Sequence, residues 1–452
     1  MLSMLSALMR LLPALALLIA AATSTPAASP DDAPIDINAL FGPVLSDKAR
    51  VYVPGDPDYP GITKRWSNLQ NPSRRCGQHC GVKPGYRSVR AAINIDLSLL
   101  KSIDLDYVND TVTIGPGVTN NQVYNVVYDV QRELPLSTDK CISTPGTMIG
   151  GGLGTLQGVR GILAESLVSA RLVTASGVLI TVSQTQHPDL FWAIRGAGHS
   201  FGIVVSATFK MFEQTNGGWS LYGDFIIPAE RNASAFELIR SVDEDLAHGV
   251  FWDILGGFNY TTMEPTLSLR LMVFGDEDYA APHLAKAKAL HPTSISWKNT
   301  TWNTYGEPSA IMCDRGWSAD MRSTRLARTD VDTLVDAWNQ WTAFAAEHEW
   351  FNGLWMQERL SEKVLMSVPE ERRGVYPWMD TKVNFSSAPL RDRVQDVMGL
   401  EHRLAYVNEA YGDEGAEVWY SAHNLPQLVK MKQQWDPNGR WGRDAYPVGS
   451  VR

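Results

Sequence analysis

A cluster of glycines is the clearest chemical signal in the sequence. Six glycines fall within the thirteen residues from Gly146 to Gly158, and Gly161 follows. Glycine lets the backbone pass where a Cβ would clash, and it exposes N–H groups that can hold a diphosphate without a lysine. No Gly-Lys-Ser/Thr triplet follows, and the strict spacing of the dinucleotide fingerprint is absent. The run alone leaves two interpretations open, a diphosphate cradle and a structural cluster of turns.

The cysteines allow a second kind of chemistry. Cys76-Gly-Gln-His79-Cys80 contains residue types that ligate metals, but no second ligand pair occurs elsewhere, so we expect no metal site. Only four cysteines occur, with the remaining two at Cys141 and Cys313. This number is far too small for a disulfide-stapled scaffold. The core must therefore hold the fold, with one or two bridges possible.

The segments around the glycine cluster alternate between strand and helix patterns. Valines at 123, 126, 127 and 130 form a 3.6-residue stripe, which predicts a helix over 120–132. Two β-rich runs flank Ala175-Ser176-Gly177 and predict a hairpin, and Pro188 with Asp189 in the first turn predicts a short helix to Trp192. Further strands are predicted over 92–96, 112–114 and 203–211.

A second unit is predicted from about 219 to 350, where strand-like runs alternate with helix-like ones. The strands are expected at 219–227 and 267–274 and the helices at 230–246 and 330–347, which is typical of an α+β unit. The fifteen tryptophans suit either an aromatic substrate roof or a large core. Near the C-terminus, Asn424 is predicted to cap a helix that ends at 436–439.

The N-terminus predicts entry into the secretory route. Arg10 precedes an apolar run from Leu11 to Ala22 and a small-residue stretch through Ala28, so we predict a signal peptide over 1–28 and a secreted protein. The alternative is a signal anchor, but the apolar part falls short of the roughly 18 residues of a membrane span. Five N-x-S/T sequons are consistent with glycosylation, at Asn109, Asn232, Asn259, Asn299 and Asn384.

Charge excludes one class of partner. The chain of 452 residues has 40 Lys+Arg against 49 Asp+Glu, for a net charge of -9. This is the wrong sign for a phosphate-binding surface, so nucleic acid is not an expected partner.

Several motifs in order resemble those of the berberine-bridge-enzyme-like FAD-linked oxidoreductases, within the vanillyl-alcohol-oxidase/PCMH-type superfamily. Gly150-Gly-Gly-Leu-Gly-Thr-Leu-Gln-Gly158, the 171–177 run, Pro188 to Gly198 and Phe201-Gly-Ile-Val204 resemble the second half of that family's FAD domain. Tyr406-Val-Asn-Glu-Ala-Tyr411, Trp419-Tyr420 and the 424–438 helix resemble its C-terminal flavin-contacting segment.

The resemblance implies an α+β fold in three parts after the signal peptide. These are a PCMH-type FAD-binding domain over 35–212, a substrate domain with an antiparallel sheet over 213–400, and a segment over 401–452 that returns to the flavin. It implies FAD contacts from Gly146, Gly150, Gly151, Gly152, Gly154, Gly202, Ile203, Val204 and Asn408. It also implies that Tyr406 accepts a substrate proton, which requires a pKa well below 10. The alternative for Tyr406 is a core aromatic residue.

Two departures from the family pattern affect the site. The family's Tyr-x-Asn-Tyr is Tyr406-Val-Asn408-Glu409 here, which makes Glu409 a second candidate base. After the entry segment Lys64 to Asn68, a βαβ unit and most of a diphosphate loop are absent, so the N-terminal FAD subdomain is expected to be incomplete and FAD binding weak.

Two residues near these departures could link FAD covalently. His79 lies in a segment that faintly resembles the family's flavin-linking Arg-x-Gly-Gly-His. Cys141 lies near the family's second flavin-linking position but two residues out of register, and the alternative for it is a structural or bridging thiol.

The sequence as a whole predicts an FAD-dependent oxidoreductase. We expect hydride transfer to the flavin from an alcohol, a sugar or a secondary-metabolite intermediate, with dioxygen as the acceptor and the protein as a soluble monomer. The rival interpretation is a non-catalytic secreted glycoprotein, or an incomplete coding sequence, that has lost flavin binding.

Overall fold

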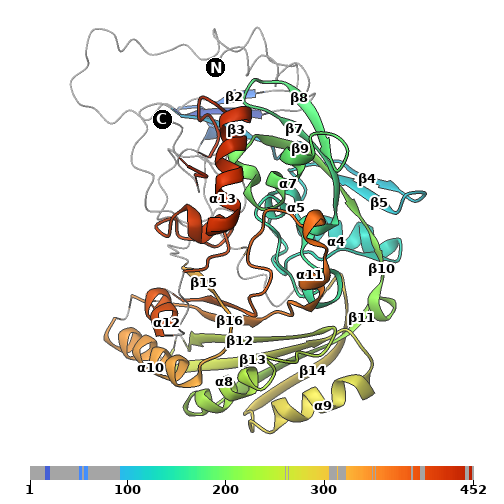
Figure 1. Cartoon of the computed structure of the whole chain (residues 1–452). Coiled ribbons are helices and arrows are strands. Elements are labelled where there is room, and N and C mark those ends of the chain that lie inside the picture. Colours follow the sequence, from blue (N-terminus) through green and yellow to red (C-terminus); the bar gives the residue numbers. More distant parts are fainter. Residues whose placement is uncertain are drawn as a thin grey trace, which may run out of the picture.

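The computed structural model describes residues 16–20, 50–52, 55–59, 92–259, 261–262, 264–304, 313, 322–348, 350–351, 353–387, 390–397, 403–442 and 447–449. The expected entry segment 64–68 and the interval 71–86, with His79, lie outside these residues. In Figure 1 the chain forms two layered units, one above the other, and the C-terminal helix α13 returns to the upper one.

The upper unit is built on a five-stranded sheet in the order β4-β5-β9-β7-β8, with every neighbouring pair antiparallel. Its strands are β4 (Ile103–Asp106), β5 (Thr111–Ile114), β9 (Ile203–Lys210), β7 (Leu167–Val173) and β8 (Leu179–Ser183). The predicted hairpin is confirmed by the pairing of β7 with β8. Helices α4 (Asn120–Asp129), α5 (Thr144–Met148), α6 (Gln157–Arg160) and α7 (Pro188–Ala197) belong to the same unit.

The lower unit is a seven-stranded antiparallel sheet in the order β14-β11-β13-β12-β16-β17-β15. Its strands are β11 (Trp219–Ile227), β12 (Val250–Phe258), β13 (Pro265–Val273), β14 (Ser294–Thr301), β15 (Ser323–Leu326), β16 (Trp355–Arg359) and β17 (Val383–Ser386). Helices α8 (Asn232–Arg240) and α9 (Glu277–Lys288) lie below this sheet in Figure 1, and α10 (Val331–Glu347) and α12 (Arg391–Val397) lie at its left end.

The two faces of the lower sheet have different roles. Trp252 and Trp355 share a buried cluster with Trp338 and Trp341 of α10, so these four tryptophans form the core between sheet and helices. Because side chains alternate along a strand, the neighbouring positions point the other way. Tyr222, Phe251 and Met272 belong instead to the cluster that contains the core of the upper unit. This second face therefore meets the upper unit.

The C-terminal helix α13 (Ala416–Trp435) begins earlier than predicted. Its backbone breaks at Ser421, where φ is +65°, and the Ser421 Oγ accepts from the Asn424 N–H at 3.2 Å. The prediction that Asn424 caps this helix is therefore wrong. Ser421 caps the helical segment after the break instead, because its side chain accepts the backbone N–H of Asn424. Further along, Lys432 Nζ donates to the Ser200 carbonyl at 2.6 Å and to Asp436 at 2.7 Å, which fixes the helix to the upper unit.

Shorter elements complete the described chain. β1 (Ala16–Ala20) pairs with β2 (Arg50–Tyr52) and with β3 (Ala92–Asp96) in a small sheet, and β1 falls within the segment predicted as a signal peptide. β6 (Arg132–Glu133) pairs with β10 (Phe212–Glu213), and α11 (Lys363–Ser367) contacts α6. Among the described residues, no helix combines the length and the apolar character that a membrane span requires.

Candidate active site

A row of polar side chains crosses all seven strands of the lower sheet at one register. Direct cross-strand pairs connect the members in sheet order, Ser296, Asp224, Arg270, Asp253, Glu358, Asn384 and Arg325. We call these seven residues the polar row. They alternate with the residues that pack on α8 and α10, so the row lies on the face toward the upper unit.

The polar row places carboxylates side by side. Asp253 lies directly opposite Glu358, and one Asp253 carboxylate oxygen is 3.5 Å from Arg270. Burial raises the pKa of Asp253 against the lowering effect of Arg270, and the negative charge of Glu358 adds to the rise. Burial also raises the pKa of Glu358, against its hydrogen bond from Asn384. Like charges directly opposite in a sheet repel, so this arrangement costs stability.

Asn384 connects the polar row to the C-terminal segment. Its Nδ2 donates to Glu358 at 2.8 Å and to Glu409 at 3.0 Å. Burial, together with the negative charge of Glu358, raises the pKa of Glu409 to about 8. A carboxyl group with this pKa can exchange a proton near neutral pH. Glu409, a candidate base in the sequence, therefore lies in the C-terminal segment beside Glu358 of β16 and Asn384 of β17.

The loop that carries Asp139, in the upper unit, faces the polar row of the lower sheet. Asp139 interacts electrostatically with Glu358 and Arg270, and burial raises its pKa to about 6. Asn120 fixes the loop by donating to the Asp139 carbonyl at 3.1 Å.

Three hydrogen-bond donors hold the Tyr406 hydroxyl in place. Its oxygen accepts from the Gly152 N–H at 3.1 Å, the Leu153 N–H at 3.3 Å and Asn408 Nδ2 at 2.7 Å. Asn408 also donates to the Thr147 carbonyl at 2.9 Å. Burial and the charge of Glu409 raise the pKa of Tyr406 above its ordinary value, although the hydrogen bonds lower it. Because the net effect keeps the Tyr406 phenol protonated near neutral pH, while Glu409 has a pKa of about 8, Glu409 is favoured over Tyr406 as the base.

The glycine loop, residues 150–154, packs against the same C-terminal residues. A Cβ at Gly150 would lie 2.0 Å from Asn408 Oδ1, and one at Gly151 would lie 2.8 Å from the Tyr376 ring. Several loop N–H groups already have protein partners: those of Gly150 and Gly151 donate to carbonyls of α5, and that of Gly152 donates to Tyr406. This loop therefore fixes Tyr406, Asn408 and Tyr376 around it, rather than offering a row of free donors.

Gly151 provides a first test of this packing. Valine at this position should displace Tyr376 and place a β-branched residue at a φ of +121°, so we expect stability to fall by roughly 1–3 kcal/mol and retained FAD to fall with it. The measurements are urea unfolding and FAD content after gel filtration. Gly415→Val is the matched control, because Gly415 has a φ of +100° with nothing within 4 Å of its Cβ position. Unchanged FAD content in a folded Gly151→Val protein would contradict the prediction.

The other predicted contact residues lie in the upper unit. A Cβ at Gly154 would lie 2.2 Å from the Leu136 carbonyl oxygen, one at Gly202 would lie 2.4 Å from that of Val173, and one at Gly146 would meet Ser143. Ile203 and Val204 open β9 and pair with β7. These contacts are made to other residues of the upper unit, and the role of these five residues toward FAD stays a prediction.

Cys141 forms a disulfide with Cys313, with a Cα–Cα distance of 5.6 Å. A sulfur in a disulfide has no thiolate to attack a flavin, so the prediction that Cys141 contacts the cofactor covalently is wrong, and the bridging alternative holds. His79 lies outside the described residues, and its link to FAD stays a prediction.

The sequons differ in exposure. Asn384 is fully buried in β17 with its Nδ2 engaged by two carboxylates, so the prediction that it carries a glycan is wrong. Asn232 is also buried, at the start of α8, and is a poor acceptor. Asn109, Asn259 and Asn299 are exposed.

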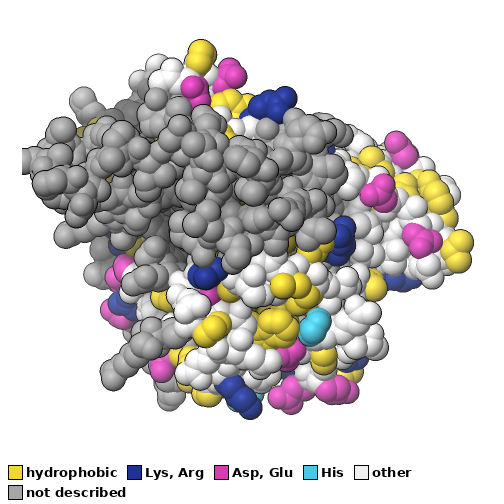
Figure 2. Space-filling model, turned by 90° about the horizontal axis from the view of Figure 1, so that it is seen from above, with side chains coloured by type: hydrophobic (Ala, Val, Ile, Leu, Met, Phe, Trp, Pro, Cys, Tyr) yellow, Lys and Arg dark blue, Asp and Glu magenta, His cyan; other side chains and the backbone are white. Residues whose placement is uncertain are grey.

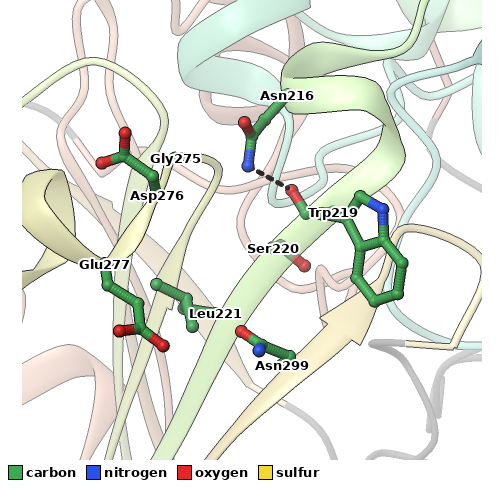
Figure 3. A pocket seen from close by; sticks show the side chains of 8 residues that line it. All are labelled: Asn216, Trp219, Ser220, Leu221, Gly275, Asp276, Glu277 and Asn299. Atoms are coloured by element: carbon green, nitrogen blue, oxygen red, sulfur yellow. Dashed lines mark hydrogen bonds between the residues drawn. The ribbon is translucent and has the colours of Figure 1, made fainter.

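The described surface and cavities add little to this site. On the face shown in Figure 2, acidic and basic side chains are interspersed over the described surface rather than gathered into one basic patch. A cavity of about 200 Å³ lies at the sheet edge, away from Tyr406 and Glu409, and its lining includes Trp219, Glu277 and Asn299. Figure 3 shows the Trp219 indole turned away from the Glu277 carboxylate, so the two side chains do not converge on one point.

Sequence reasoning missed Asp253, Glu358 and Asp139. A signal was present, because Asp224, Asp253 and Arg270 are single charges within otherwise apolar or small-residue strands. Charges inside a buried strand demand partners on the same face of the sheet.

Residues 75–183 match the family model of the FAD binding domain. The chain is 40% identical to an FAD-linked oxidoreductase of Aspergillus fumigatus, fmqD, over 91% of this chain and 92% of the relative. It is 32% identical to the FAD-linked oxidoreductase tazL of Aspergillus terreus, over 90% and 93%. The first alignment spans 459 positions, more than the whole chain has, so that relative contains residues without a counterpart here.

Solved structures share the fold. Berberine bridge enzyme from Eschscholzia californica superimposes with a TM-score of 0.64 at 14% identity, covering 79% of this chain and 80% of that one. A berberine-bridge-like protein from Physcomitrella patens gives a TM-score of 0.64 at 15% identity, over 78% and 81%. Xylooligosaccharide oxidase from Myceliophthora thermophila, solved with xylobiose, gives 0.63 at 21% identity, over 78% and 82%.

Proposed function

We propose that this chain is an oxidase of a small organic molecule. The premise is that it belongs to the FAD-linked oxidoreductases and has the berberine-bridge-like PCMH-type fold. The substrate is an alcohol, a sugar or a secondary-metabolite intermediate that gives up a hydride from a C–H bond. A sugar is included because the structural neighbour solved with xylobiose is a xylooligosaccharide oxidase. Dioxygen is the proposed electron acceptor.

The described residues fit FAD as the cofactor. The Tyr376 ring lies beside Gly151, and its buried hydroxyl has no hydrogen-bond partner among the described residues. The buried Thr155 hydroxyl, directly after the glycine loop, also has none. These two hydroxyls suit the carbonyl and nitrogen atoms of a flavin ring, and a Cβ on the glycine loop would displace Tyr376 and Asn408. We therefore assign Tyr376 and Thr155 to FAD contact, with Asn408 and the glycine loop as their support.

FAD, when bound, supplies the hydride acceptor, and the protein supplies position and proton transfer. Asn384 orients the Glu409 carboxylate by donating to it, and a pKa of about 8 lets Glu409 take a substrate proton. Tyr406 is a positioning residue, because its hydroxyl joins Asn408 to the glycine loop. Asp253 is buried, which strengthens its charge interactions with Arg270 and Glu358.

The single observation that carries this function is the convergence of Glu409, Tyr406 and the glycine loop between two units of a flavoprotein fold. The test is direct. The purified protein should absorb near 450 nm, and substrate should bleach this band under anaerobic conditions. Air should restore the band with formation of one hydrogen peroxide per turnover. Purified, folded protein that lacks the band even after incubation with FAD would reject the proposal.

We also propose that the protein is secreted as a monomeric glycoprotein. The support is the N-terminal pattern of residues 1–28 and the exposure of Asn109, Asn259 and Asn299. Mass spectrometry of protein from the native host should show an N-terminus close to residue 29 and glycans on some of these three residues, with none on Asn384. An intact N-terminus with no glycan would contradict the proposal.

A further inference from the structure

The cavity at the edge of the lower sheet has a glycosylation sequon in its lining. Asn299 begins the sequon Asn-Thr-Thr on β14, and it lines the cavity of about 200 Å³ together with Trp219 of β11. Asn299 is exposed, unlike the buried Asn384 and Asn232. An acceptor for a sugar and an aromatic side chain therefore share one hollow of the surface.

The register of β11 and β14 puts these two side chains on one face of the sheet. Leu221 pairs directly with Asn299, and Trp219 lies two residues before Leu221, so all three point to the same side. Diagonal cross-strand neighbours lie about 7–8 Å apart, within reach of long side chains. Figure 3 shows the Trp219 indole extending from β11 toward the strand that carries Asn299. A sugar on the Asn299 amide can therefore reach the indole.

The Trp219 indole offers a flat apolar surface at this place. Trp219 is 55% exposed. A single exposed aromatic side chain needs no partner, but this one adjoins a site for sugar attachment. One face of an N-acetylglucosamine ring presents C–H groups, which the negative face of an indole attracts. Asn216 and Glu277 at the rim of the cavity add side-chain oxygens that can accept from sugar hydroxyls.

The strand that carries Asn299 is also a free edge of the lower sheet. β14 comes first in the strand order, and among the described strands only β11 pairs with it. It has 8 residues, and Ile295 on it is 44% exposed, whereas β15 at the other edge has 4 residues, all buried. A long exposed edge is a template for pairing with another chain, and proteins protect such edges. A glycan on β14 would obstruct that pairing.

We propose that Asn299 carries an N-glycan whose first N-acetylglucosamine packs on the Trp219 indole, and that this docked glycan protects the β14 edge. The proposal rests on the proposed secretion of the protein. In the transfer, Asn299 Nδ2 forms a bond to C1 of the sugar, and the bond from C1 to a lipid-linked diphosphate breaks. The lipid diphosphate leaves with the proton that Nδ2 gives up. The docking on Trp219 is non-covalent.

Protein secreted by the native host tests the docking. Peptide N-glycosidase cleaves the bond between the sugar and asparagine, so a docked first sugar should slow this cleavage in the folded protein. Trp219→Ala should accelerate the cleavage at Asn299 by about fivefold or more, the scale of losing a contact of about 1 kcal/mol. Trp219→Phe keeps a flat ring and should have a smaller effect. Mass spectrometry of peptides measures each site separately.

The glycans at Asn109 and Asn259 are the internal controls, because their cleavage rates should not depend on the residue at 219. Equal rates at Asn299 in the unchanged protein and in Trp219→Ala would overturn the docking. Glycans on these control sites without one on Asn299 would overturn the proposal and leave the proposed secretion intact. A protein without any glycan would contradict both.

Asn299→Gln tests the protection of the edge. This variant lacks the glycan, so light scattering on mild heating should show more aggregation than in the unchanged protein. Asn109→Gln is the matched control, because it removes a glycan from the hairpin of β4 and β5 in the upper unit. Aggregation of Asn299→Gln no greater than that of Asn109→Gln would overturn the protective role.

Discussion

Replacing Glu409 with glutamine is expected to slow anaerobic reduction of the flavin by about 10²–10⁴-fold, the range for losing a general base. Glutamine preserves the shape and can still accept from Asn384, but it cannot take a proton. The pKa of about 8 also fixes the pH dependence, because only the deprotonated carboxylate acts as a base. The rate in the unchanged protein should therefore rise with pH through about 8 and then level off, and this rise should vanish in Glu409→Gln. Stopped-flow absorbance at 450 nm measures both effects.

Two companion variants separate Glu409 from its surroundings. Glu417→Gln makes the same chemical change at an exposed position of α13 and should leave the rate unchanged. Tyr406→Phe leaves three donors without an acceptor, so we expect loss of retained FAD, with a smaller loss of rate in the molecules that keep it. A tyrosine variant slower than the Glu409 variant, at equal FAD content, would return the role of base to Tyr406.

Stability is expected to fall as pH rises from about 4 to 8 and then to level off. An unfolded glutamate loses its proton near pH 4.3, whereas folded Glu409 keeps its proton to about pH 8, so between these values the folded state binds more protons. Rising pH therefore favours the unfolded state over this window. A pKa difference of one corresponds to about 1.36 kcal/mol, so Glu409 alone accounts for roughly 2–4 kcal/mol. Asp139, with a pKa raised to about 6, adds to the loss between pH 4 and 6.

Urea unfolding at pH 5.5, 7 and 8.5 measures this trend. Glu409→Gln removes the titrating group, so its stability should depend less on pH and exceed that of the unchanged protein at pH 8.5. Glu417→Gln should follow the unchanged protein at every pH. A stability that increases from pH 5.5 to 8.5 would show that the buried carboxylates are already compensated by positive charge.

The sequence predicted the elements with strong local signals. The α10 helix and the β11 strand have the predicted bounds to within one residue, because their apolar periodicity agrees with their burial. The C-terminal helix was harder. Asn424 is a good capping residue, yet Ser421 adopts a positive φ and captures the Asn424 N–H, which no periodicity reveals. The shortened interval 69–91 lies outside the described residues, and sequencing of a transcript would test whether coding sequence is missing there.

The candidate site was predicted in part. The structure brings Tyr406, Asn408 and Glu409 close to the glycine loop, as the motifs indicated. The loop N–H groups were expected to hold a diphosphate, but several of them donate to protein atoms instead. The polar row could not be derived from spacing along the chain, because its members come from seven strands and only the register brings them to one line. Strand order and register depend on long-range pairing, which local patterns do not specify.

The bond between Gly152 and Tyr406 joins residues 254 positions apart, and Tyr406 belongs to the last fifty residues of the chain. During synthesis, domains generally fold from the N-terminus while the chain emerges at about 5–20 residues per second. The sheet of the upper unit can form from residues 103–210, but the glycine loop lacks its partners until the final segment is released. With FAD bound beside this loop, as proposed, capture of the cofactor is a late event in biogenesis, and a premature stop codon anywhere before Tyr406 yields a chain whose glycine loop lacks Tyr406 and Asn408.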